Sequence, residues 1–211
     1  MASSPDTQRA RVSLVDQVYR SIKLGIVDGT YPPGSSLRLS ELTEVHEMSV
    51  IPIREALRKL EVERLVETAP NRGARVAPIS HEDVRDAYMT RVMLEGEAVR
   101  RAWDAITPEL LEELHRLQQE LMDAYVRGDE VSAPELHRQL HFTMYEAAGS
   151  PWLLHLIEIL WNHTERYRRL SLALRPALGP GEDIHRDVIQ AMEEGRQADA
   201  IESLERYLRH T

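Results

Sequence analysis

The fold is decided by residues 31–80, which read YPPGSSLRLSELTEVHEMSVIPIREALRKLEVERLVETAPNRGARVAPIS. A loop rich in Pro, Gly and Ser opens the stretch, and helical periodicity then predicts helices over 40–46 and 49–63 with a tight turn between them. The turn residues Asn-Arg-Gly at 71–73 predict a small hairpin after the second of these helices. Because helical periodicity also runs over about 12–27, the predicted order is helix, helix-turn-helix, wing.

The predicted helix over 49–63 carries both a buried face and a basic one. Apolar residues recur at helical spacing and predict a buried stripe made of Ile53, Ala56, Leu57 and Leu60. Ser49 stands where it can cap the helix, and Pro52 lies in the first turn, where its missing N–H breaks no helical bond. Arg54 and Arg58 lie one turn apart and off the buried stripe.

A helix end of this kind suits DNA. The exposed N-terminus can meet phosphates, and an arginine one turn further along can reach a phosphate or the edge of a guanine. Arg72 and Arg75 of the hairpin are placed to meet a flanking phosphate or the minor groove. Arginines at helical spacing also occur on plain solvated faces, so the pattern alone leaves DNA binding and a solvated helix surface both open.

Charge divides the chain into two parts. The formal net charge is −9, which by itself opposes a nucleic-acid partner. Residues 1–79, however, carry 11 basic and 10 acidic side chains, whereas residues 80–211 carry 15 and 25. We therefore expect an N-terminal tail over 1–11, a winged helix-turn-helix over 12–79 and a separate helical domain over 80–211.

Helical periodicity continues nearly to the end of the chain after Ser80. It is broken near 106–109, 127–135, 148–152, 175–183 and 194–197, which leaves about six helices of ordinary length. Thr107-Pro108 and Ser150-Pro151 each pair a capping residue with a proline at a first-turn position. The predicted fold class is therefore mainly α, with an N-terminal winged helix-turn-helix and a C-terminal all-α bundle of about six helices.

Composition excludes several kinds of site. The chain has no cysteine, which rules out disulfides, thiolate metal sites and cysteine nucleophiles. Its start lacks the apolar core of a signal peptide, and its most apolar run, PWLLHLIEILW at 151–161, is too short to span a bilayer. We expect a cytoplasmic protein with no membrane segment.

The motifs of residues 12–80 resemble those of the winged-helix domain in GntR-type bacterial transcription regulators. Pro-Gly and then Leu precede the second helix, PIREALRKLE begins at Pro52, and PNRGARV begins at Pro70. Such domains bind double-stranded operator DNA. The resemblance implies a DNA-binding surface made of Arg38, Ser40, Ser49, Val50, Pro52, Arg54, Arg58, Arg72, Gly73 and Arg75.

The chain departs from the family's pattern in three places. Members usually carry Gly-Val-Ser-Arg before the recognition helix, whereas this chain has EMSV at 47–50, so Val50 replaces an arginine that commonly contacts DNA. Ser40 stands where some members have another arginine, and Arg64 stands where glycine is usual. The retained Arg54 and the wing imply DNA binding with a different or weaker operator preference.

Residues 81–211 resemble the FCD effector domain of the same family, in which an Asp and three His commonly hold a divalent metal that helps to grip a small carboxylate. These ligands fall on His137, which replaces the Asp, on His141 and His185, and on Tyr207, which replaces the last His. Neutral imidazoles suit zinc or nickel, whereas a tyrosine with an unperturbed pKa of about 10 is a poor ligand. The resemblance therefore implies a zinc or nickel ion on His137, His141 and His185.

The rest of an effector pocket is expected around these histidines. The family's R-x-x-x-E motif falls on Arg91 and Glu95, and Tyr207 is placed to donate a hydrogen bond to a ligand. His163 lies in WNHTERYRR at 161–169, on a helix expected to border the cavity. We expect these four residues to bind the effector. In the alternative, the pocket holds no metal and the three histidines hydrogen-bond the effector directly.

Two functions compete on this sequence. The first is a ligand-responsive transcription regulator, expected to be a repressor, whose homodimer reads a pseudo-palindromic operator and binds a small carboxylate effector. The rival is a metalloenzyme whose three histidines activate water, but HRQLH at 137–141 lacks the glutamate of H-E-x-x-H. A purely structural helical module leaves the winged-helix motifs unexplained, so we expect a regulator and not an enzyme.

Overall fold

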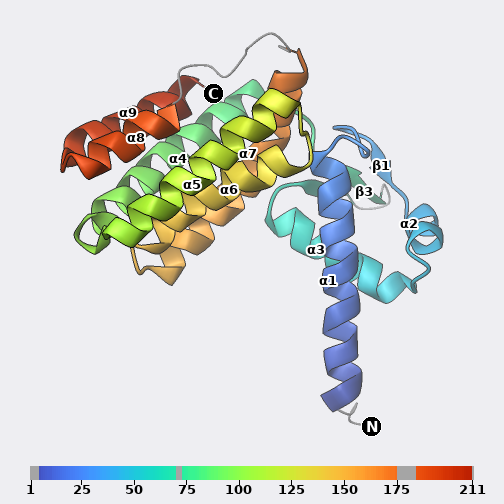
Figure 1. Ribbon diagram of the computed structural model, residues 1–211. Helices are drawn as coiled ribbons and strands as arrows, with labels where there is room; N and C mark the ends of the chain where they lie inside the picture. The colour runs from blue at the N-terminus through green and yellow to red at the C-terminus, as the bar shows by residue number, and fades with distance from the viewer. Residues whose placement is uncertain (1–4, 70–72, 175–183, 211) are drawn as a thin grey trace. The chain divides into compact units, whose positions relative to one another are not determined.

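The computed structural model describes residues 5–69, 73–174 and 184–210, with side chains over 14–68, 73–168 and 184–209. Contacts divide the chain into two compact units (Figure 1). The first unit comprises residues 1–84 together with 162–171, and the second comprises residues 85–161 together with 172–211. Each unit contains one of the two predicted sites.

The first unit is a winged helix-turn-helix, as the sequence predicted. Its elements in chain order are α1 (Pro5–Val27), β1 (Ser36–Leu37), α2 (Leu39–Val45), α3 (Val50–Val62), β2 (Val66–Ala69) and β3 (Gly73–Val76). The strands form an antiparallel sheet in the order β1-β3-β2, with Ser36 and Glu67 both opposite Arg75. The helix-turn-helix boundaries lie within one residue of those predicted from periodicity.

The predicted stripe of α3 lies in the core of this unit. Ile53, Ala56, Leu57 and Leu60 are all buried, and α3 packs against α1 (Figure 1), which contributes Val18, Ile22 and Ile26 to the same core. Two details of the prediction were wrong. The first helix begins at Pro5 and not near residue 12, because the polar segment after Pro5 contains good helix formers and no breaker. Ser49 does occupy the N-cap position, but its side chain makes no capping hydrogen bond.

Two residues of this unit stand in a backbone conformation that favours glycine. Glu47 has φ 51° and Arg64 has φ 57°, and they are the non-glycine residues with positive φ in the described part of the chain. These are the two positions at which the GntR pattern usually has glycine. A side chain with a Cβ atom costs about 1–2 kcal/mol in this region, so the two departures from the pattern have a structural cost.

Replacing Glu47 with glycine should therefore stabilise the protein. We expect Glu47→Gly to exceed Glu47→Ala by about 1 kcal/mol in free energy of unfolding, because both remove the charge but only glycine relieves the backbone, and its greater freedom in the unfolded chain offsets part of the gain. Denaturant unfolding of the two variants measures the difference. Equal stabilities would show that Glu47 is not strained.

The second unit is built from helices. After Ser80 the described residues form six α-helices, the number predicted, which are α4 (His81–Ala102), α5 (Pro108–Arg127), α6 (Ser132–Glu146), α7 (Pro151–Leu174), α8 (Ile184–Glu193) and α9 (Gln197–His210). A short 3₁₀ helix, Trp103–Ala105, follows α4. The first residues of α4 and residues 162–171 of α7 belong to the first unit.

The predicted breaks fall between these helices, except for that at 175–183, which lies outside the described residues. Thr107 caps α5 by accepting a hydrogen bond from the Leu110 N–H at 3.2 Å, and Gly128 ends it in the left-handed region with φ 63°. In Figure 1, α8 and α9 lie side by side, and α5 packs against both α6 and α8. None of the helices in the described part of the chain combines the length and apolar character that a membrane span requires.

Candidate functional site

Several predicted DNA-binding residues come together in one groove of the first unit. The groove is open, has a volume of about 500 Å³, and is lined by residues of the β1–α2 segment, α3 and the wing. We call it the α3 groove. Its lining includes the predicted residues Arg38, Ser40, Arg54, Arg58 and Gly73, all of which are exposed. Three separate parts of the sequence therefore present polar and basic groups to one surface.

The arginines at this surface differ in their partners. Arg54 and Arg58 are exposed, and neither forms an ion pair or a hydrogen bond with the described residues. Arg38, by contrast, lies 3.0 Å from Glu41, and Arg75 donates to Glu67 through Nε at 2.9 Å and Nη2 at 2.6 Å. Arg54 and Arg58 are thus available to DNA without losing a protein partner.

The remaining predicted DNA contacts cluster at the start of α3. Ser49 and Val50 are exposed, and Pro52 is half-buried in the first turn. Val50 is 41% exposed, but its side chain has no hydrogen-bond donor, so that side chain can give DNA only an apolar contact. Arg72 lies outside the described residues.

The three predicted metal ligands lie together in the second unit. His137 and His141 stand one turn apart on α6, His185 is at the start of α8, and one ligand atom from each lies within 4.8 Å of the others. The Nε2 atoms of His141 and His185 are 3.0 Å apart. Tyr207 on α9 places its hydroxyl 3.1 Å from Nε2 of His137. We refer to these four residues as the histidine cluster.

A buried chain of hydrogen bonds fixes the orientation of His141. Tyr145 donates its hydroxyl proton to Glu95 Oε2 at 2.6 Å, and the same hydroxyl lies 2.8 Å from Nδ1 of His141. Burial, and then the neighbouring Glu95 carboxylate, raise the pKa of Tyr145 well above its usual value, so the hydroxyl keeps its proton. Nδ1 of His141 must then be the donor, which leaves the lone pair on Nε2, directed at His185.

Arg91 and Glu95 contact the histidine cluster indirectly, through Tyr145 and Trp161. They form a fully buried ion pair with Arg91 Nε 2.5 Å from Glu95 Oε1. Burial would lower the pKa of Arg91, but the Glu95 carboxylate outweighs it and raises that pKa, so the guanidinium stays charged. The guanidinium also lies 4.6 Å from the ring centre of Trp161, whose ring in turn borders His137 and His141. Arg91 and Glu95 therefore act on the histidines through Tyr145 and Trp161.

The donor set fits a divalent metal. Two imidazole nitrogens bound to one tetrahedral zinc ion, at about 2.0–2.1 Å each, lie about 3.3 Å apart, close to the His141–His185 separation of 3.0 Å. His141 presents an unprotonated Nε2. Its Nδ1 is hydrogen-bonded to the Tyr145 hydroxyl, which in turn donates to Glu95. Metal-bound histidines usually have such a hydrogen bond at their second nitrogen. Three histidine ligands would leave one of the four positions of a tetrahedral ion for water or a ligand.

A small cavity of about 20 Å³ adjoins the cluster. It is lined by His141, His185 and Tyr207 and otherwise by apolar side chains, namely Leu114, Leu140, Met144, Ile184, Val188, Ile189 and Leu204. Its volume is enough for one or two groups of the size of a water molecule or a methyl. Arg91 and Glu95 are not among the lining residues.

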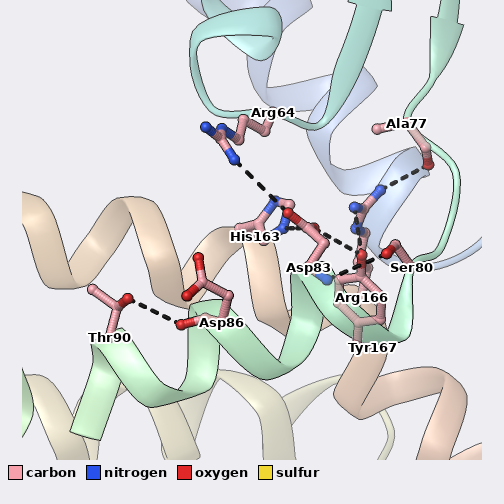
Figure 2. A network of polar contacts seen from close by, with 9 residues as sticks. All are labelled: Arg64, Ala77, Ser80, Asp83, Asp86, Thr90, His163, Arg166 and Tyr167. Carbon is pink, nitrogen blue, oxygen red and sulfur yellow. Dashed lines mark hydrogen bonds and ion pairs between the residues drawn. The ribbon is translucent and has the colours of Figure 1, made fainter. Parts of the chain in front are cut away.

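The prediction that His163 borders this cavity was wrong, and Figure 2 shows where it lies. His163 Nε2 is 2.7 Å from Asp83 Oδ2 in the first unit. Two residues along a helix correspond to a rotation of about 200°, so Trp161 contacts the histidine cluster while His163 points elsewhere. Sequence reasoning missed Asp83 as its partner. It also missed Tyr145, although Tyr145 lies one helical turn after His141.

Comparisons with known proteins match both halves of the chain. The family model described as "Bacterial regulatory proteins, gntR family" covers residues 14–76, and that of the "FCD domain" covers residues 86–210. The HTH-type transcriptional regulator BphR of Paraburkholderia xenovorans is 33% identical over 177 residues, 78% of this chain and 70% of that protein. The HTH-type transcriptional repressor GlaR of Escherichia coli is 34% identical over 160 residues, 73% of this chain and 72% of that protein.

A solved structure extends this likeness to the fold. The structure of Escherichia coli McbR/YncC superimposes with a TM-score of 0.78 at 25% identity, and covers 93% of this chain and 94% of that one. The first family match lies over the α3 groove and the second over the helices that carry the histidine cluster. The α3 groove therefore lies in one matched domain and the histidine cluster in the other.

Proposed function

Since the chain belongs to the GntR family of bacterial transcription regulators and carries an FCD domain, we propose that it is a repressor whose operator affinity is set by a small carboxylate effector. The family makes it a DNA-binding transcription regulator and not an enzyme, so the metalloenzyme alternative is set aside. The observation that supports the effector most is the convergence of His137, His141 and His185.

A divalent metal, zinc or nickel, is the group that these histidines would hold. When bound, the metal would offer an open coordination position to a carboxylate oxygen. The protein's own contribution is orientation. Tyr145 and Glu95 keep Nε2 of His141 unprotonated, and Tyr207 places a hydroxyl beside His137, where it can donate to an effector oxygen.

The apolar lining of the cavity favours a short, apolar monocarboxylic acid as the effector. Apart from the cluster's own residues, its lining consists of Leu, Met, Ile and Val side chains, which offer no partner to a second charge or to hydroxyl groups. A buried polar group without a partner is costly, so a dicarboxylate or a sugar acid would be rejected. The nearby Arg91 is already paired with Glu95 and is therefore not free to bind a second carboxylate.

A homodimer would carry two α3 helices to a pseudo-palindromic operator, with one helix in each major-groove half-site. Met89 and Met93 stand one turn apart on α4 and are 46% and 66% exposed. Exposed apolar side chains at that spacing could be buried by a second copy of the chain in a homodimer. We infer repression from the relative GlaR, which is named a repressor. Because a bacterial operator lies in the cytoplasm, we also propose that the protein acts there.

Fluorescence anisotropy with DNA that the protein selects from a random-sequence pool tests the DNA half of this proposal. We expect the protein to bind the selected duplex more tightly than other DNA, with an affinity that falls steeply as salt is added. Sedimentation should show two protein chains bound per duplex. A scrambled duplex of the same length is the control. Equal affinity for both duplexes would contradict sequence-specific binding.

A further inference from the structure

The first turns of α3 present apolar side chains to solvent on both sides of Arg54. Val50 is 41% exposed and Ile51 is 53% exposed, although both side chains are large and apolar. Residues three and four positions apart are neighbours on a helix, and at 3.6 residues per turn Val50 and Ile51 fall on opposite sides of Arg54. One basic and two branched apolar side chains therefore share one exposed surface. We call Val50, Ile51 and Arg54 the Val50 patch.

The two apolar residues of the patch are not part of the core of the first unit. The buried residues of α3 are Ile53, Ala56, Leu57 and Leu60, and these four residues form the helix's share of the core that it builds with α1. Val50 and Ile51 are exposed instead. Replacing either one with alanine therefore changes the surface of the unit and leaves no cavity in its packing.

Helix stability does not account for the composition of this turn. Valine and isoleucine have lower helix propensities than alanine or glutamate, because their branched side chains lose rotamer freedom in a helix. The first turn of α3 has no acidic residue, which would interact favourably with the helix dipole, and Ser49 makes no capping hydrogen bond through its side chain. Single exposed apolar side chains are ordinary on protein surfaces, but here two adjacent ones border an arginine. The turn is better suited to contact a partner than to stabilise α3 itself.

The partner at this surface is DNA, since the GntR family match over residues 14–76 includes the whole patch. In helix-turn-helix proteins the N-terminal residues of the recognition helix contact the edges of bases in the major groove. Most groups on those edges are hydrogen-bond donors or acceptors, which valine and isoleucine cannot pair with. The exception is the C5 methyl group of thymine, which apolar side chains contact.

The spacing within the patch sets the spacing of the bases that it can contact. The Cβ atoms of helix residues three or four positions apart lie about 5–6 Å from each other, and successive base pairs rise by about 3.4 Å. If Arg54 pairs with the edge of a guanine, Val50 and Ile51 reach bases one or two pairs away. The patch therefore fits a guanine with a thymine close beside it.

We infer that Val50 and Ile51 are specificity-determining residues that recognise the C5 methyl group of a thymine one or two base pairs from the guanine bound by Arg54. This inference rests on the proposed sequence-specific binding of an operator. It also gives the departure from the GntR pattern at position 50 a function. An arginine at that position would pair with guanine, whereas valine selects thymine.

Replacing thymine with uracil tests the inference, because it removes the methyl group and leaves the Watson–Crick pairing unchanged. Uracil is placed at each thymine of the selected duplex in turn, and Kd is measured by fluorescence anisotropy. In each half-site we expect a sensitive thymine one or two base pairs from a guanine. Loss of its methyl group should weaken wild-type binding by about two- to five-fold, as expected for one apolar carbon removed from contact.

Three variants connect the methyl group to the protein. In the double variant Val50→Ala/Ile51→Ala, uracil at the sensitive position should have almost no effect on Kd. Val62→Ala is the matched control, since Val62 is a 78% exposed valine at the other end of the same helix, and it should keep the full uracil sensitivity. Val50→Arg, taken through the same selection from a random-sequence pool, should recover guanine at the position where the wild type recovers thymine.

Four outcomes would contradict the inference. Three leave sequence-specific binding standing: no thymine whose replacement by uracil weakens wild-type binding, recovery of thymine by Val50→Arg, or equal uracil sensitivity in the double variant and the wild type. In the last of these, the methyl group would act through the shape of the DNA and not through the patch. The fourth, equal affinity of the wild type for the selected and scrambled duplexes, would overturn both the inference and the proposed operator binding.

Discussion

Replacing Arg54 with alanine is expected to weaken binding of the selected operator by about 5- to 150-fold, which corresponds to the 1–3 kcal/mol of a bidentate arginine–guanine contact. Arg54 is exposed in the α3 groove, one turn into the recognition helix, and no carboxylate among the described residues competes for it. Arg38 and Arg75 must first leave Glu41 and Glu67, so their replacement should cost less.

Two comparisons make the Arg54 result specific. Arg20→Ala removes the same charge from an exposed position of α1 outside the α3 groove and should change Kd by less than about two-fold, as expected for screened surface charge. Arg54→Lys keeps the charge but not the planar fork, so it should retain binding to the scrambled duplex and lose preference for the selected one. Unchanged affinity in Arg54→Ala would show that the recognition helix does not use this residue.

Replacing His141 with alanine is expected to abolish metal binding. The wild-type protein, purified without an affinity tag or chelator, should contain about one zinc or nickel ion per chain, and His141→Ala should contain almost none. His141 is the central ligand because its Nε2 faces His185 while Nδ1 is held by Tyr145. Elemental analysis and the thermal shift on adding metal measure the loss.

Two further variants distinguish a metal ligand from a residue that only orients a ligand. Tyr145→Phe keeps all three histidines and removes only the hydroxyl between His141 and Glu95, so metal affinity should fall by about 10- to 100-fold without vanishing. His155→Ala, at an exposed position of α7, should keep the full metal content. Metal-free wild-type protein with no thermal shift on adding zinc or nickel would instead support a pocket in which the histidines hydrogen-bond the effector directly.

The sequence was sufficient for those features that local periodicity determines. The stripe of Ile53, Ala56, Leu57 and Leu60 predicted which face of α3 is buried, and capping residues such as Thr107 predicted where helices begin. The spacing of His137 and His141 by one turn, taken with the family's motif, was enough to bring His185 into the same cluster.

Features that depend on contacts between distant residues could not be predicted in this way. Glu95 and Tyr145 are 50 residues apart in the chain and Asp83 and His163 are 80 apart, and neither pair leaves a periodic trace. The prediction for His163 was wrong because the pattern of α7 does not reveal that the helix changes partners after Trp161. The starting point of α1 was missed because amphipathic periodicity does not mark polar helix turns.

The proposed regulation depends on a link between effector binding at the histidine cluster and operator affinity, and one titration measures this link. Operator affinity is followed by anisotropy while propionate is added to zinc-loaded protein and, in parallel, to protein stripped by a chelator. We predict that propionate weakens operator binding of the zinc-loaded protein by at least about five-fold, the lower end of typical coupling between sites, and has no effect on the stripped protein. Operator affinity that is the same with and without propionate in both samples would contradict the proposed regulation.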